Sequence, residues 1–157
     1  MVVAILLLQY PAFVGRNHRQ EIVFQSEEPQ KCFGCGPDNP KGLRLRFFEV
    51  PEGVEVEYVV PEHLGGAPGV VHGGIQATLL DEALCMTSYA KNGTPVVTGE
   101  LTVRYMAPLP TETPILIRSR ITGTKGRSYF AEAEIFVAGK PDLVTRGKAR
   151  LFPTAID

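Results

Sequence analysis

The 157-residue sequence has few cysteines, little net charge and no long apolar run, and each shortage excludes a class of protein. The three cysteines are an odd number, which excludes a framework of disulfide bonds in a chain of this length. The net charge of -1 gives no bulk attraction to nucleic acid or to an anionic membrane. The apolar run near the N-terminus is far shorter than the roughly 20 residues that span a bilayer. We therefore expect a cytoplasmic protein with no nucleic-acid or membrane partner.

Two of the cysteines, Cys32 and Cys35, form a CxxC motif, which is typical of half a zinc site or of a redox pair. A zinc knuckle requires two further ligands nearby, and only His18 lies close in the sequence. A redox pair would begin a helix, whereas the following residues, GPDNPKG, favour a turn. We predict a tight cysteine-containing loop in a reducing compartment, with no bound metal and no cofactor.

Length and composition predict one folded domain preceded by an arm. The hydrophobic content of 44% and the charged content of 21% are typical of a soluble globular protein. The first residues, MVVAILLLQYPAF, lack the basic start of a signal peptide. We expect residues 1–31 to form an N-terminal arm or extension and residues 32–157 to form the domain.

Alternation of apolar and polar residues predicts a sheet. Residues 43–50 and 54–60 alternate across a short PEG break, which indicates a β-hairpin. The second half of the chain continues with four alternating segments joined by short breaks, which predicts antiparallel strands at 96–106, 115–121, 128–137 and 143–152.

Between the two groups of strands, the segment from Ile75 to about Tyr89 predicts a helix. It has no proline or glycine, and Asp81 and Glu82 are its only charged residues, so we expect it to be buried on nearly all sides. Lys91 and Gly93 are typical of a helix C-terminus. Because nothing else is large enough to cover this helix, we predict an α+β fold with a curved antiparallel sheet wrapped around one long central helix.

Two features near the start of this helix are locally unfavourable, and together they indicate a functional site. Glycine destabilises a helix, yet two glycines follow His72; a buried carboxylate is costly, yet Asp81 and Glu82 lie inside the apolar segment. The HGG at 72–74, the LLDEA at 79–83, the strand ELTVRYMAPLP at 100–110 and the lead-in CFGCGPDNPKGL at 32–43 resemble the hot-dog thioesterase superfamily. The resemblance covers roughly residues 32–152 and is nearest to phenylacetate-pathway and human thioesterase-superfamily members.

This resemblance implies an acyl-CoA thioesterase that cleaves fatty or aromatic acyl-CoA to the free acid and CoA. Gly73 matches the residue whose backbone N–H polarises the thioester carbonyl, with Gly74 beside it, and a helix N-terminus suits a developing oxyanion. Asp81 matches the catalytic carboxylate, acting as general base or as nucleophile. Thr98 matches a hydroxyl residue that orients the water or the carboxylate in some members.

Further residues are expected at the substrate. His72 fixes the helix entrance or lies near the carbonyl, and Gln76 faces the thioester from the first helical turn. Gly66 stands where several relatives carry Asn or Gln, so either a neighbour such as His63 or Glu62 substitutes for that group or the site works without it. The phosphates of CoA would require basic side chains at the rim of the site, for which Lys125 and Arg127 are candidates. Glu82 is expected to form a salt bridge or an interface contact.

The resemblance also implies a homodimer or homotetramer with the active site at the subunit interface. Two other functions stay open. One is a non-catalytic module that binds acyl-CoA or lipid, which the glycine at position 66 favours. The other is an acyl-carrier hydratase or dehydratase that pairs His63 with Asp81. The identity of the acyl chain does not follow from the sequence.

Overall fold

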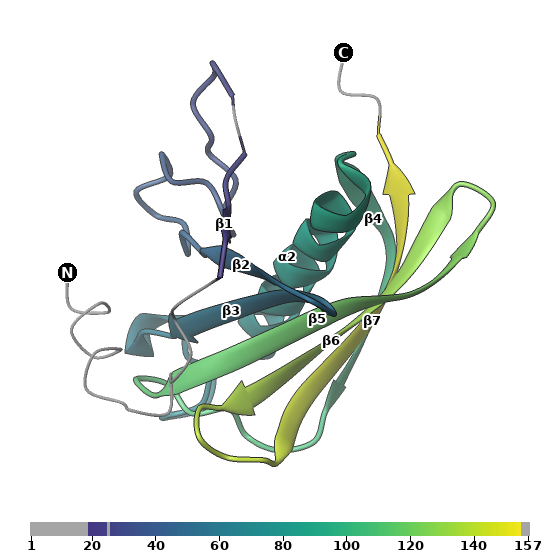
Figure 1. Cartoon of the computed structure of the whole chain (residues 1–157). Coiled ribbons are helices and arrows are strands. Elements are labelled where there is room, and N and C mark those ends of the chain that lie inside the picture. Colours follow the sequence, from purple (N-terminus) through teal and green to yellow (C-terminus); the bar gives the residue numbers. More distant parts are fainter. Residues whose placement is uncertain (1–18, 25, 155–157) are drawn as a thin grey trace.

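The computed structural model describes residues 19–24 and 26–154, which form one curved antiparallel sheet and the helix that it surrounds (Figure 1). The sheet has seven strands in the order β1-β2-β3-β5-β6-β7-β4. In chain order its strands are β1 (Glu21–Ile22), β2 (Phe47–Val50), β3 (Gly53–Val59), β4 (Val96–Tyr105), β5 (Pro114–Lys125), β6 (Ser128–Val137) and β7 (Leu143–Pro153). The helix is α2 (Gly73–Asn92), and a short 3-10 helix, η2 (Glu62–Leu64), precedes it.

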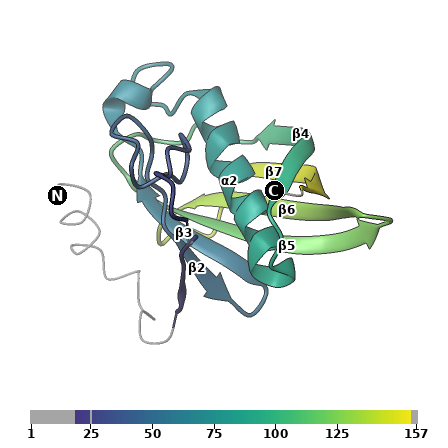
Figure 2. The same cartoon turned by 90° about the horizontal axis from the view of Figure 1, so that it is seen from above.

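The helix lies along the concave face of the sheet, as the view from above shows (Figure 2). Leu79, Leu80 and Leu84 are fully buried there against apolar side chains of the strands. Gly147 of β7 allows this close approach, because a Cβ atom at that position would lie 3.2 Å from Leu80. The predicted α+β architecture, a sheet wrapped around one long helix, is confirmed.

The convex face of the sheet carries ion pairs in place of a second apolar layer. Arg118 pairs with Glu55 at 2.9 Å, and Arg146 pairs with Glu132 at 3.0 Å and Glu134 at 2.7 Å. Because this face is charged, the sheet buries its apolar side chains on the other face, where α2 lies.

Several element boundaries differ from the sequence-based prediction for local reasons. The helix begins two residues earlier, at Gly73, because the side chain of His72 caps it, and ends at Gly93, whose φ of 67° matches the expected glycine stop. Strand β5 continues past Ile121 through an irregularity to Lys125, so the turn to β6 is only two residues long. Residues 43–46 precede β2 without joining the sheet.

The N-terminal arm contributes one short element to the described part of the chain, β1, which pairs with β2. Residues 1–18 lie outside the described residues. They include most of the predicted arm and His18, the possible metal ligand. None of the helices found in residues 19–24 and 26–154 is long and apolar enough to cross a membrane.

Candidate active site

The entrance of α2 is organised by the side chain of His72. His72 is the N-cap residue, and its Nδ1 accepts a hydrogen bond of 2.9 Å from the backbone N–H of Gly74. Its own carbonyl accepts the N–H groups of Ile75 and Gln76. The Gly74 N–H is therefore occupied within the protein.

The N–H of Gly73 is the donor that stays available. No acceptor within the described part of the chain bonds it, whereas the neighbouring Gly74 N–H bonds His72. The Gly73 carbonyl accepts a hydrogen bond of 2.8 Å from the hydroxyl of Tyr105, at the end of β4. Sequence reasoning placed Tyr105 in a strand and did not identify this contact, which holds the first residue of the helix against β4.

Two turns further along α2, Asp81 lies beside the start of β4. The Thr98 hydroxyl donates a hydrogen bond of 2.6 Å to Asp81 Oδ1, so the predicted pairing of a helix carboxylate with a strand hydroxyl is present. The Cys85 thiol lies 3.3 Å from the same hydroxyl oxygen. Burial raises the pKa of Cys85 to about 12, so this neighbour is a neutral thiol at physiological pH. Cys85 was not predicted here, although it follows Asp81 by one helical turn.

These groups border an open pocket of about 460 Å³ between α2, β4 and the N-terminal segment. Its walls combine the carboxylates of Asp81 and Glu82 with thiols and apolar side chains. The residues around it are Phe24, Cys32, Cys35, Asp81, Glu82, Cys85, Met86, Tyr89, Pro95, Val96, Val97 and Thr98. The helix is buried on most sides, in line with the prediction, and one stripe of it lines this pocket. A largely apolar pocket with a few polar groups is typical of a small-molecule site.

The N–H of Gly73 and the carboxylate of Asp81 are far apart within one chain. Eight residues separate them on α2, and at 1.5 Å per residue this is about 12 Å along the helix axis. Two groups at that separation do not act on the same carbonyl carbon. A site that uses both must combine one group from each of two copies.

Gln76 is not at the pocket, contrary to expectation. It is 4% exposed, and its amide bonds the protein at both ends. Nε2 donates to the carbonyl of Val71 at 3.0 Å, and Oε1 accepts from the hydroxyl of Thr145 at 2.5 Å. Gln76 thus ties the turn before the helix to β7.

The remaining predicted binding residues lie at two places. His63 is exposed on η2, and Gly66 packs beside the cap, since a Cβ atom there would lie 3.4 Å from His72 Cα. Lys125 ends β5 and Arg127 lies in the turn to β6, a hairpin tip that projects away from α2 (Figure 1). Neither basic residue lines the pocket. Their contact with CoA phosphates stays a prediction.

Glu82 has a partner that the sequence did not indicate. No salt bridge to it is found among residues 19–24 and 26–154; instead the thiol of Cys32 lies 3.2 Å from its Oε1 and is the donor. The two residues are 50 positions apart, so no local pattern links them. The lead-in loop and the helix therefore meet next to Asp81.

Comparison with known proteins identifies relatives of this arrangement. The family described as the thioesterase superfamily matches residues 68–143, which run from the loop before α2 to the start of β7. Rat acyl-coenzyme A thioesterase THEM4 is 31% identical over 87 residues, which are 55% of this chain and 37% of that protein. MIOREX complex component 3 of Saccharomyces cerevisiae is 32% identical over 96 residues, 58% of this chain and 34% of that protein.

Solved structures with a similar fold include members of the thioesterase superfamily. The crystal structure of zebrafish thioesterase superfamily member 2 superposes with a TM-score of 0.65 at 24% identity, covering 77% of this chain and 88% of that one. The chain spans about a third of the length of the two curated relatives named above. The family match over residues 68–143, the hot-dog sheet around α2 and the HGG entrance of that helix agree, and the chain has the hot-dog fold of the thioesterase superfamily.

Proposed function

We propose that this protein hydrolyses acyl-CoA thioesters, with Asp81 as the catalytic carboxylate. The observation that carries the proposal is the hydrogen bond of 2.6 Å from Thr98 to Asp81 Oδ1 in the wall of an open pocket. The match to the thioesterase superfamily over residues 68–143 and the similarity to rat acyl-coenzyme A thioesterase THEM4 support the reaction class.

The geometry favours Asp81 as a general base. Thr98 occupies Oδ1, which leaves Oδ2 to accept a proton from a water molecule. The resulting hydroxide attacks the thioester carbon, the carbonyl oxygen gains the negative charge, and a backbone N–H at the start of α2 stabilises it. Collapse of this intermediate breaks the C–S bond, and the proton held by Asp81 passes to the leaving thiolate. The products are the free acid and CoA.

The active site we propose is shared between two copies of the chain. The separation of about 12 Å between Gly73 and Asp81 on one helix supports this, because the oxyanion donor must then come from a second subunit. Strand β4 supports it as well: it is an edge of the sheet, and Val97 and Tyr105 on it are at least half exposed. Unpaired edges of this kind favour pairing with another strand. The three free cysteines support a reducing compartment such as the cytoplasm.

The test is release of free thiol from a panel of short, medium, long and aromatic acyl-CoAs. We expect the wild-type chain to release thiol from at least one, and Asp81→Asn to lower kcat by about 10²- to 10⁴-fold, the usual contribution of a general base. Asp142→Asn, which makes the same change in an exposed loop, serves as the matched control and should retain full activity.

Three results would contradict the proposal. Turnover by Asp81→Asn at the wild-type rate would exclude the catalytic role of that carboxylate. Tight acyl-CoA binding without thiol release by the wild type would instead identify a binding module, the function that Gly66 favours. Consumption of an unsaturated acyl thioester without release of thiol would identify a hydratase.

A further inference from the structure

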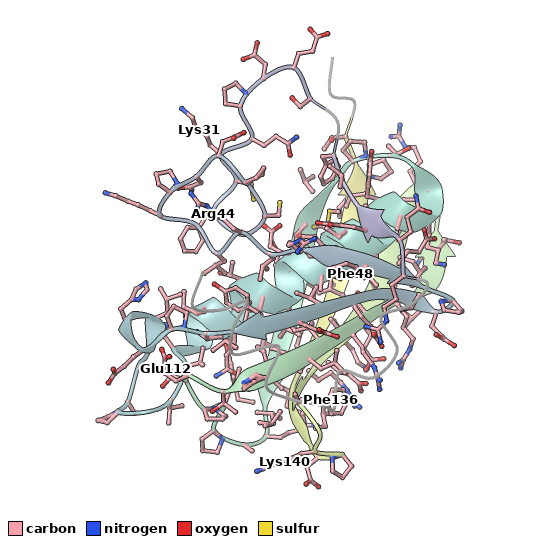
Figure 3. The ribbon with its side chains drawn as sticks, turned by 60° about the vertical axis from the view of Figure 1, so that its left-hand side comes forward. Lys31, Arg44, Phe48, Glu112, Phe136 and Lys140 are labelled. Carbon is pink, nitrogen blue, oxygen red and sulfur yellow. The ribbon has the colours of Figure 1, made fainter. Side chains whose placement is uncertain are left out.

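The lead-in loop and the central helix bring three metal-ligating side chains together outside the Asp81–Thr98 pair. One sulfur atom each of Cys32 and Cys35 and one carboxylate oxygen of Glu82 all lie within 4.8 Å of one another. The cysteines come from a tight turn in which the N–H of Gly36 donates to the carbonyl of Cys32 at 2.9 Å. Figure 3 shows this loop, between the labelled Lys31 and Arg44, beside the helix.

The loop is fitted closely to Glu82. A Cβ atom at Gly34, between the two cysteines, would lie 2.2 Å from Glu82 Cγ, so only glycine allows the backbone to pass at this point. Gly36 is equally restricted, because a Cβ atom there would lie 2.5 Å from the backbone nitrogen of Cys32. Both glycines of the CFGCG sequence are thus required for the turn and for its contact with α2. The backbone of the loop is held further by hydrogen bonds from Leu45 to Gly34 and from Leu43 to Phe33.

The charges around this cluster are unbalanced. Glu82 is half-buried, and no basic side chain of the described residues forms a salt bridge with it. A half-buried carboxylate is costly without a compensating positive charge, and a cation among these three groups would supply it.

We propose that Cys32, Cys35 and Glu82 bind one Zn²⁺ ion and so fasten the lead-in loop to the central helix. Two thiolates at C-x₂-C spacing with an oxygen ligand suit zinc, whereas Mg²⁺ and Ca²⁺ prefer all-oxygen sites. With Zn–S of about 2.3 Å and Zn–O of about 2.1 Å, the ligand atoms of a tetrahedral site lie about 3.6–3.8 Å apart. The three atoms all lie within 4.8 Å of one another, so shifts of about 1 Å or less reach this geometry, and the 3.2 Å between Cys32 Sγ and Glu82 Oε1 widens slightly.

Binding releases the two thiol protons and leaves a site of net charge −1, with water as the fourth ligand. The sequence argued against a metal because only His18 lies close to the two cysteines in the chain, whereas folding brings Glu82 to them. This proposal does not depend on the proposed catalysis. It concerns Glu82 and the lead-in loop, which forms one wall of the pocket, and it uses no atom of Asp81.

The test uses the full chain, reduced with a phosphine so that all thiols are free, and Co²⁺ as a spectroscopic probe. We expect one equivalent of Co²⁺ to give a thiolate-to-metal charge-transfer band, and Zn²⁺ to abolish that band by displacement. Cys32→Ser and Cys35→Ser should lose the band and the bound zinc measured after dialysis. Cys85→Ser is the matched control and should retain both, because the Cys85 thiol contacts Thr98 instead of the cluster.

A second measurement needs no variant and so does not depend on whether the serine chains fold. Zn²⁺ should protect Cys32 and Cys35 of the wild-type chain from alkylation, read by mass spectrometry of the peptides, and a chelator should remove the protection. Absence of the band in the wild type, an unchanged band in Cys32→Ser, or equal alkylation with zinc and with chelator would each overturn the proposal. Circular dichroism confirms that the variants compared are folded.

Discussion

The hydroxyl of Thr98 decides which oxygen of Asp81 is free for chemistry. It donates to Oδ1 at 2.6 Å, and the same hydroxyl oxygen lies 3.3 Å from the neutral thiol of Cys85. This chain of three side chains joins α2 to β4 and fixes the orientation of the carboxylate. Thr98 therefore positions the base that we propose, and its own atoms do not react.

Replacing Thr98 by valine tests this positioning role. Valine keeps the shape of the side chain and removes the hydroxyl. A hydrogen bond to a charged acceptor contributes about 1.5–3 kcal/mol, so we expect kcat to fall about 10- to 100-fold with KM nearly unchanged. Thr98→Ser, which keeps a hydroxyl, should recover most of the rate. Equal kcat for the valine and wild-type chains would show that Thr98 only supports the strand.

At the scale of the element, the start of α2 presents one free donor because of how it is capped. His72 has φ of −57° and ψ of 138°, and its side chain takes the N–H of Gly74. Gly73 is the first helical residue, a position where proline is well tolerated since the N–H there makes no helical hydrogen bond. The extended conformation of His72 also suits a residue before proline.

The substitution Gly73→Pro therefore removes the proposed oxyanion donor and leaves the helix start intact. We expect kcat to fall about 10²- to 10³-fold, as for loss of one oxyanion-hole donor. Gly73→Ala is the matched control: it adds a Cβ atom 3.3 Å from the Tyr105 hydroxyl, as proline does, and retains the N–H. If both variants lose activity equally, the contact with Tyr105 is responsible and the N–H is not the donor.

The same element shows what the sequence could predict. Alternation and composition predicted the strands and the helix, whereas the family resemblance predicted a catalytic role for Asp81 and a hydroxyl partner at Thr98. The sequence-based prediction placed the helix start two residues too late. The reason is that the His72 side chain caps the helix, and intrinsic helix propensities do not describe such a cap. Gln76 was assigned to the substrate because a first-turn position is often open, whereas Thr145, 69 residues away, binds its amide.

The features that the sequence could not predict arise from contacts between segments far apart in the chain. Cys32 and Glu82 are 50 residues apart, and only the folded sheet places the lead-in loop on α2. The glycines at 34 and 36 were available in the sequence as turn residues, but their fit against Glu82 and Cys32 depends on distances that a single chain does not reveal before folding. Sequence reasoning therefore predicted the elements better than the side-chain pairs between them.

At the scale of the whole molecule, β4 forms an edge of the sheet that is left unpaired within the described part of the single chain. Among the described strands it pairs only with β7, and apolar side chains are exposed along it and on its neighbour, with Val97 at 53% and Phe152 at 37%. The groups proposed to act on one thioester lie about 12 Å apart along one helix. Pairing of two copies would cover the edge and bring a Gly73 of one chain towards the Asp81 of its partner.

Mixed dimers test this arrangement directly. Asp81→Asn and Gly73→Pro are each expected to be nearly inactive alone. When the two are co-expressed with different tags, each mixed dimer contains one site with an intact Gly73 from one chain and an intact Asp81 from the other. Dimers that form at random then carry about a quarter of the wild-type number of active sites, since half of them are mixed and each mixed dimer has one good site. The purified doubly tagged species holds only mixed dimers, so it should release thiol at about half the wild-type rate per dimer. Its mass in solution is obtained by light scattering. A mixed dimer that stays inactive would place both groups in sites within single chains, and a monomeric wild type that turns over acyl-CoA would exclude the shared site altogether.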